Sequence, residues 1–274
     1  MKATLILAHL GAGLFCLGLA FSVHHSVFAG ENPYPGFSVG AQSYCFRNFD
    51  LDGALKNTQE LGLKNIEFFR KHASHDMTPE QVKEVKAKLK AAGINVVAYG
   101  VEGFGANEEA NEKIFKFAKE MGIGILSADP APESFDSLEK LVKKYDIKIA
   151  IHNHGPGSRY SSLDDVLNAV KGRDERIGAC LDNGHFQRSG VDGADAARKL
   201  GKRVHAVHLK DLDKNNGDQI LGNGVGNIPA IMKALKEVGF SGPLNLEYEI
   251  EADNPVPSMK KCLEYLSKVC KEIK

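Results

Sequence analysis

The sequence predicts an α/β protein, a (β/α)8 barrel built as a single domain after an N-terminal signal peptide. Apolar strand-like segments alternate with amphipathic helix-like segments, and eight such units follow one another through residues 30–274 without a change in composition. A length near 250 residues is typical of this barrel. A doubly wound sheet is the alternative, but it rarely needs eight units of similar size, so the barrel is favoured.

The first 29 residues are predicted to be a secretory signal peptide. Lys2 precedes a long apolar stretch, and Val27, Phe28 and Ala29 have the small-residue spacing of a signal-peptidase site. The alternative is that the same segment stays uncleaved and anchors the protein in a membrane. No later segment is long and apolar enough to span a bilayer. We therefore expect an exported protein, periplasmic or secreted, without a stable membrane anchor, whose mature chain begins near Gly30.

Eight apolar segments rich in β-branched and aromatic residues are predicted to be the barrel strands. They are residues 37–45, 63–69, 94–101, 123–129, 147–153, 177–183, 203–209 and 243–249. The stretch 147–151 is apolar on both faces, as expected of a parallel strand covered by helices.

The clearest helix is predicted over residues 78–93. Thr78 is a suitable N-cap, Pro79 occupies the first helical position, Gln81 completes a capping box and Gly93 fits the C-cap. The same amphipathic pattern extends over two later segments, residues 107–122 and 134–145. Helices between the strands are what a (β/α)8 barrel requires.

The charge of the chain is balanced. Lysine and arginine together number 35, aspartate and glutamate also number 35, and no Lys/Arg run stands out. This pattern lacks the basic patch of a nucleic-acid-binding protein. It also offers no cluster that would hold a phosphate group. We expect a small-molecule partner and no nucleic acid; the sequence does not indicate an oligomeric state.

Ligand-type side chains stand at the C-terminal ends of the last four predicted strands, where barrel enzymes carry their catalytic groups. In IKIAIHNHG (147–155) the alternation of a strand places His152 and His154 on one face. The same parity directs one residue of each strand inward at a corresponding height: His152, Asp182, His208 and Glu247. A lone histidine or aspartate at a strand end is more often a capping or hydrogen-bonding group.

The four residues together predict a metal site. Neighbouring buried carboxylates are costly unless a cation compensates their charge. We therefore expect one divalent metal ion. Two imidazoles and two carboxylates suit manganese, zinc or cobalt better than calcium.

Three segments, CLDNGH, HLKD and GPLNLEYE, resemble the sugar phosphate isomerase/epimerase family, the xylose isomerase-like TIM barrels. GNGVGNIPAIMKALKEVGFSGPLNLEYE also resembles the last unit of that family, and the resemblance covers essentially the whole mature chain. It implies one divalent metal held by a glutamate on strand five, an aspartate on six, a histidine on seven and a glutamate on eight. The matching positions are His152, Asp182, His208 and Glu247, and the substrate-binding histidine after strand six would be His185.

One position departs from the family pattern. His152 stands where typical epimerases have a glutamate that both binds the metal and moves a proton. A ligating imidazole has one lone pair, which the metal would occupy. The symmetric two-carboxylate epimerase mechanism is therefore in doubt for this chain.

Four residues are expected to carry the chemistry. Glu247 would be both ligand and base, as in the family, and His154 is a second candidate base. His185 or Lys210 would polarise a substrate carbonyl. The competing interpretations are a purely structural hydrogen bond for His154, and an ion pair with Asp211 or Glu249 for Lys210.

Two further residues of inward parity are expected in the substrate pocket. Glu67, on the second strand, would orient His154 or the substrate, although a salt bridge inside the barrel is equally compatible with its position. Gln42, on the first strand, would line the pocket wall. Tyr44 on the same strand and Asp129 on the fourth strand share this parity.

The preferred function is a divalent-metal-dependent isomerase or epimerase acting on a free sugar or sugar derivative. It would remove a proton next to a carbonyl and stabilise the enolate. A 3-keto-glycoside lyase or hydrolase on the same scaffold is the alternative, since elimination needs only one proton abstraction. A catalytically silent sugar-binding barrel is the third hypothesis. The DNA-repair branch of this superfamily is disfavoured by the balanced charge and the predicted export.

Overall fold

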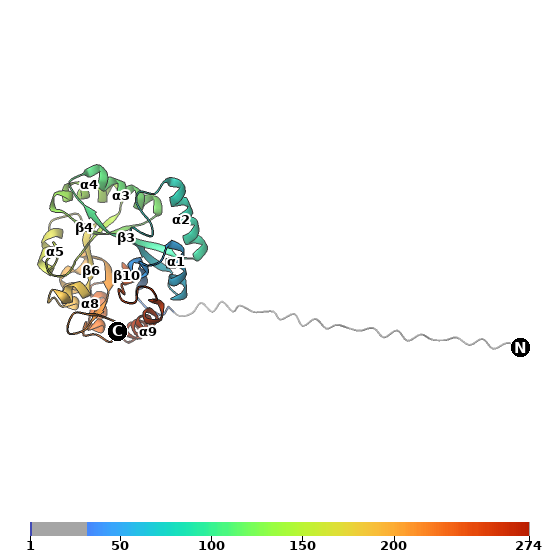
Figure 1. Cartoon of the computed structure of the whole chain (residues 1–274). Coiled ribbons are helices and arrows are strands. Elements are labelled where there is room, and N and C mark those ends of the chain that lie inside the picture. Colours follow the sequence, from blue (N-terminus) through green and yellow to red (C-terminus); the bar gives the residue numbers. More distant parts are fainter. Residues whose placement is uncertain (2–31, 274) are drawn as a thin grey trace. The chain divides into compact units, whose positions relative to one another are not determined.

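The computed structural model describes Met1 and residues 32–273, so the predicted signal peptide lies outside the described residues apart from Met1. Eight parallel strands close into a barrel in the order β1, β10, β7, β6, β5, β4, β3, β2. Helices surround this barrel (Figure 1). The predicted (β/α)8 barrel is confirmed.

Each of the eight predicted strands is present in the barrel. Their bounds are β1 (Ser38–Gln42), β2 (Asn65–Phe68), β3 (Asn95–Phe104), β4 (Ile125–Pro130), β5 (Lys148–His152), β6 (Ile177–Asp182), β7 (Val204–Leu209) and β10 (Pro243–Leu246). A short antiparallel hairpin, β8 (Asp211–Leu212) with β9 (Asp218–Gln219), follows β7 outside the barrel.

The connecting segments are mainly helical, as predicted. The helices are α1 (Leu51–Glu60), α2 (Pro79–Ala92), α3 (Glu108–Met121), α4 (Phe135–Tyr145), α5 (Leu163–Val170), α6 (Asn183–Arg188), α7 (Gly193–Leu200), α8 (Ile228–Glu237) and α9 (Val256–Glu272). Helix α2 has the predicted capping box between Thr78 and Gln81 and ends at Gly93 in the left-handed conformation. Short 3-10 turns occupy Ser43–Phe46, Pro132–Ser134 and Gly201–Arg203.

The first and last barrel strands end earlier than predicted. The side chain of Gln42 accepts a hydrogen bond from the backbone N–H of Tyr44 and caps the 3-10 turn that replaces the end of β1. After β10, the N–H of Tyr248 donates to the sulfur of Cys45 rather than to a neighbouring strand. Both changes occur at the barrel mouth, where loops replace the ladder.

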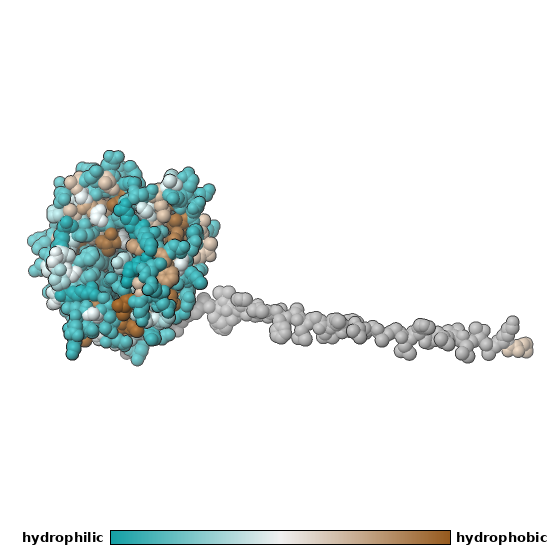
Figure 2. All heavy atoms as spheres, in the orientation of Figure 1, coloured by the Kyte–Doolittle hydropathy of each residue, from teal (hydrophilic) through white to brown (hydrophobic). Residues whose placement is uncertain are grey.

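Small side chains fill the barrel below its C-terminal end. Ala150, Cys180 and Ala206 form a separate buried cluster inside it. The face shown in Figure 2 is largely hydrophilic, with apolar side chains in small separate patches. No helix among the described residues is long and apolar enough to cross a membrane.

Candidate metal centre and active site

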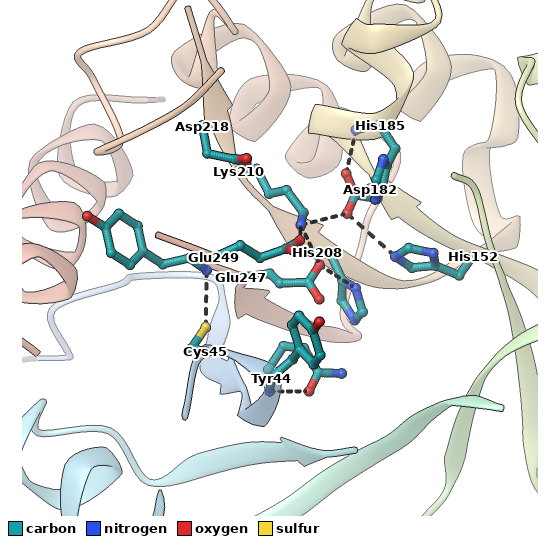
Figure 3. Close-up of polar contacts among 12 residues, drawn as sticks. Tyr44, Cys45, His152, Asp182, His185, His208, Lys210, Asp218, Glu247 and Glu249 are labelled. Atoms are coloured by element: carbon teal, nitrogen blue, oxygen red, sulfur yellow. Dashed lines mark hydrogen bonds and ion pairs between the residues drawn. The ribbon is translucent and has the colours of Figure 1, made fainter. Parts of the chain in front are cut away.

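Four buried side chains converge at the C-terminal end of the barrel, and we call them the quartet: His152, Asp182, His208 and Glu247. They come from β5, β6 and β7 and from the position directly after β10. One ligand atom from each lies within 4.8 Å of the other three. Figure 3 shows these side chains pointing toward one another. The structure therefore brings together the residues that strand parity selects.

Each member of the quartet carries one buried polar atom without a hydrogen-bond partner. These atoms are His152 Nε2, Asp182 Oδ2, His208 Nδ1 and Glu247 Oε2. Their nearest polar neighbours lie within the cluster: His208 Nδ1 is 3.1 Å from Glu247 Oε2, and His152 Nε2 is 3.5 Å from Asp182 Oδ2. None of the four forms a well-aligned hydrogen bond, although buried polar atoms almost always do, so a cation would complete the cluster. Two nitrogens and two carboxylate oxygens are a donor set that fits a divalent transition metal. The quartet thus fits the ion that its sequence pattern predicts.

A second group that could hold a metal contains Cys180 with His152 and His208. Burial raises the pKa of the Cys180 thiol, and a metal ligand must be the thiolate. The quartet also supplies one more donor. We therefore assign the site to the quartet.

Glu67 holds His208 from inside the barrel. Its Oε2 accepts hydrogen bonds from His208 Nε2 (2.9 Å) and Asn245 Nδ2 (2.6 Å). With a metal bound, this contact would keep the proton of His208 on Nε2 and leave Nδ1 as the ligand atom. Glu67 is completely buried beneath the quartet and does not line the cavity, so it orients neither His154 nor a substrate; its contact with His208 is the salt bridge inside the barrel that was the alternative.

Replacing Glu67 by glutamine should weaken metal binding about 10- to 100-fold, the usual effect of losing a carboxylate behind a histidine ligand. Calorimetric titration of the metal-free protein would measure it. Glu102→Gln is the matched control, because Glu102 is also a buried strand glutamate but does not contact the quartet. Equal affinities for both variants would contradict this role of Glu67.

Lys210 lies behind the quartet rather than in front of a substrate. Its Nζ pairs with Glu249 and lies 3.1 Å from Glu247 Oε2 and 3.8 Å from Asp182 Oδ2. Figure 3 shows this arrangement. Burial would lower the pKa of Lys210, but the three carboxylates raise it, so the ammonium stays charged. The expectation that Lys210 polarises a carbonyl is wrong, since its side chain is buried among carboxylates; the ion pair with Glu249 is correct.

The same cation keeps the quartet carboxylates ionised. Burial would raise the pKa of Asp182, but Lys210 and His152 outweigh it and lower the value to about 2. The pKa of Glu247 likewise lies well below its usual range because Lys210 and His208 outweigh burial. Both side chains are therefore available as anions.

Asp211 organises the glycine-rich loop instead of pairing with Lys210. Its carboxylate accepts hydrogen bonds from the backbone N–H groups of Gly222 (2.8 Å), Gly224 (3.1 Å) and Gly226 (2.9 Å). A side chain at Gly224 would collide with this carboxylate, so glycine is required there. The loop that leads into α8 is thus fixed beside the end of β7.

Two asparagines, which sequence reasoning missed as site residues, tie the strand ends together. Asn153 exchanges two hydrogen bonds with the backbone of Asp182 (2.8 and 2.9 Å), and Asn183 does the same with Lys210 (2.8 and 3.0 Å). Each asparagine directly follows a quartet residue in the chain, and that repeated order was the available signal. These amide pairs fix the spacing of β5, β6 and β7 at the site.

A cavity of about 440 Å³ opens above the quartet. Its lining includes two quartet members, His152 and Glu247, and also Gln42, Tyr44, Phe69, Arg70, Gly100, Val101, His154, His185 and Glu249. Gln42 lies in this lining, where its parity places it, and its amide donates to Gly100 O (3.2 Å). Both expected histidines, His154 and His185, lie at this cavity.

The two cavity histidines are neutral, since burial lowers the pKa of each to about 4. Nδ1 of His154 lies 3.3 Å from Nδ1 of His152. Nδ1 of His185 lies 3.2 Å from Arg188 Nη1, which donates to it. Their ring centroids are 5.1 Å apart, so they form one polar wall of the cavity.

Comparison with known proteins gives one family. The family described as "Xylose isomerase-like TIM barrel" matches residues 55–269. The inosose dehydratase of Clostridium perfringens is 24% identical over 218 residues, which cover 73% of this chain and 71% of that protein. The inosose isomerase of Bacillus velezensis is 25% identical over 149 residues, which cover 48% of this chain and 52% of that protein.

A solved structure is also similar along its whole length. An uncharacterized protein from Parabacteroides distasonis superposes with a TM-score of 0.69 and is 32% identical. The match covers 85% of this chain and 99% of that one.

Proposed function

This chain belongs to the xylose isomerase-like TIM barrel family, and on that premise we propose that it is a divalent-metal-dependent lyase. It would remove the proton next to the carbonyl of an unphosphorylated keto-sugar or keto-cyclitol and then eliminate water or an aglycone. The observation that carries this proposal is the quartet, whose four converging polar atoms form no well-aligned hydrogen bond. A bound divalent cation would polarise the carbonyl and make the adjacent C–H group more acidic.

Glu247 is the proposed base. It is an anion that reaches the cavity, and it is held by Lys210 at 3.1 Å. It would take the proton next to the carbonyl, the electron pair would form the new double bond, and the C–O bond of the leaving group would break. The departing oxygen would then take the proton back from Glu247 or from water, which balances the reaction.

His154 and His185 would bind oxygens of the substrate. If His152 binds the metal through Nε2, its Nδ1 carries a proton and donates to Nδ1 of His154. His185 likewise uses Nδ1 as an acceptor, from Arg188. Each cavity histidine then has Nε2–H as its remaining donor, so we propose hydrogen bonding to the leaving oxygen rather than the role of second base for His154.

Elimination is favoured over epimerisation because His152 replaces one of the two carboxylates that would exchange protons on opposite faces of a substrate. The inosose dehydratase match also covers more of this chain than the inosose isomerase match. Isomerisation remains the second candidate, since inosose isomerase is a relative and a proton shift on one face needs only one base.

The cavity lining supports an unphosphorylated substrate. Among the described lining residues, the one arginine, Arg70, forms an ion pair with Asp76 (2.5 Å). Lys210 forms an ion pair with Glu249, so it is not free to bind a phosphate group. Our proposal includes export through the N-terminal segment, on the sequence pattern of residues 1–29.

Product analysis would test the reaction class. Metal-loaded protein should release water from an inosose or the aglycone from a 3-keto-glucoside, as measured by mass spectrometry. Glu247→Gln should lower kcat about 10²- to 10⁴-fold, the usual contribution of a general base. A product of unchanged mass with deuterium incorporation would favour isomerisation, and no turnover across the panel would favour a silent barrel.

A further inference from the structure

The cavity has an apolar wall that the proposed elimination does not use. Tyr44, Phe69 and Val101 line it, whereas the polar wall carries the histidines, Glu247 and Glu249. Tyr44 and Val101 are 38% and 36% exposed, and few other large apolar residues of the described chain are this exposed. Exposed apolar surface inside a cavity is typical of a ligand contact.

The cavity is also larger than one sugar ring requires. Its volume of about 440 Å³ lies in the range of cavities that hold drug-sized ligands. A ring held by its oxygens at the quartet and the histidines therefore leaves room for a second group.

The aromatic residues of this wall are fixed before any ligand arrives. Tyr44 and Phe69 pack edge to face with ring centroids 5.4 Å apart, and Phe69 packs in the same way on His72 at 4.7 Å. The guanidinium of Arg47 lies 4.9 Å from the centre of the Tyr44 ring. The amide of Gln42 also fixes the turn that carries Tyr44. Such preorganised rings bind apolar ring faces with little loss of side-chain freedom.

We propose that Tyr44, Phe69 and Val101 form a subsite for an apolar, ring-shaped aglycone. The inference rests on the proposed elimination and narrows its substrate to a keto-glycoside, in which the leaving group occupies this subsite and the keto-sugar ring occupies the quartet side. The wall residues contact the leaving group and determine specificity, while Glu247 and the histidines act on the sugar.

The test compares three 3-keto-β-glucosides that differ in their aglycone: methyl, cyclohexyl and glucosyl. Methanol and cyclohexanol are leaving groups of similar acidity, so a difference in KM reports binding. We expect a KM about 10-fold lower for the cyclohexyl than for the methyl compound, because contact with aromatic rings buries apolar surface. Tyr44→Ala and Phe69→Ala should remove this difference, Tyr44→Phe should keep it, and Val225→Ala, an exposed residue outside the cavity, should leave it unchanged.

The outcomes separate this inference from the function on which it rests. If the wild type turns over neither a 3-keto-glucoside nor an inosose, the proposed elimination is wrong. If it eliminates methanol and cyclohexanol with equal KM, or prefers an inosose or the glucosyl compound, the elimination stands and the apolar subsite is wrong. The wild-type comparison decides even if an alanine variant does not fold.

Discussion

Removing the divalent metal with a chelator should abolish turnover and lower the melting temperature by roughly 8–16 °C. A metal present at about a thousand times its dissociation constant stabilises the folded state by about 4 kcal/mol. For a chain of this size, each kcal/mol corresponds to about 2–4 °C. Calorimetry before chelation, after chelation and after metal is added back would measure the shift.

Variants of His152 would test whether the change in melting temperature comes from metal bound at the quartet. His152→Ala should melt at the lower temperature with or without metal, while His152→Glu should still respond because a carboxylate is also a ligand. His75→Ala is the control, since His75 lies outside the quartet. A metal response of wild-type size in His152→Ala would show that this residue is not a ligand.

Much of the barrel could be predicted because its local rules agree with its fold. The capping box of α2 and its terminal glycine set that helix to within a residue of the prediction. The quartet was accessible for the same reason: strand alternation selects the inward face, and the C-terminal ends of parallel strands meet at one end of the barrel.

Strand parity tells which side chains point into the barrel. It does not tell how high along the barrel axis a side chain lies or which residue on another strand it contacts, and the structure differs from the predictions in these respects. Glu67 points inward as predicted, but it contacts His208 on a strand 141 positions away in the chain rather than a substrate. Tyr44 lies at the cavity, as its parity predicts, but on a 3-10 turn that the side chain of Gln42 caps and not on β1. Side-chain contacts of this kind are tertiary, and no local pattern encodes them.

Replacing Lys210 by methionine should destabilise the metal-free protein by about 3–5 kcal/mol, the usual cost of breaking a buried ion pair by removing one partner. Lys210 is 2% exposed and compensates Asp182, Glu247 and Glu249. Without it, the quartet carboxylates would be left with no permanent cation in the metal-free state. Chemical denaturation, with and without metal, would measure the free energy of unfolding.

Saturating metal should reduce this loss, because a divalent cation would compensate Asp182 and Glu247 from the other side, while Glu249 would remain unpaired. Lys199→Met is the control: Lys199 is 57% exposed in its pair with Asp195, and such surface pairs contribute about 0–1 kcal/mol. A loss in Lys210→Met as small as that of the control would mean that the carboxylates are compensated elsewhere. If metal does not change the stability lost in Lys210→Met, then Lys210 and the metal do not compensate the same carboxylates.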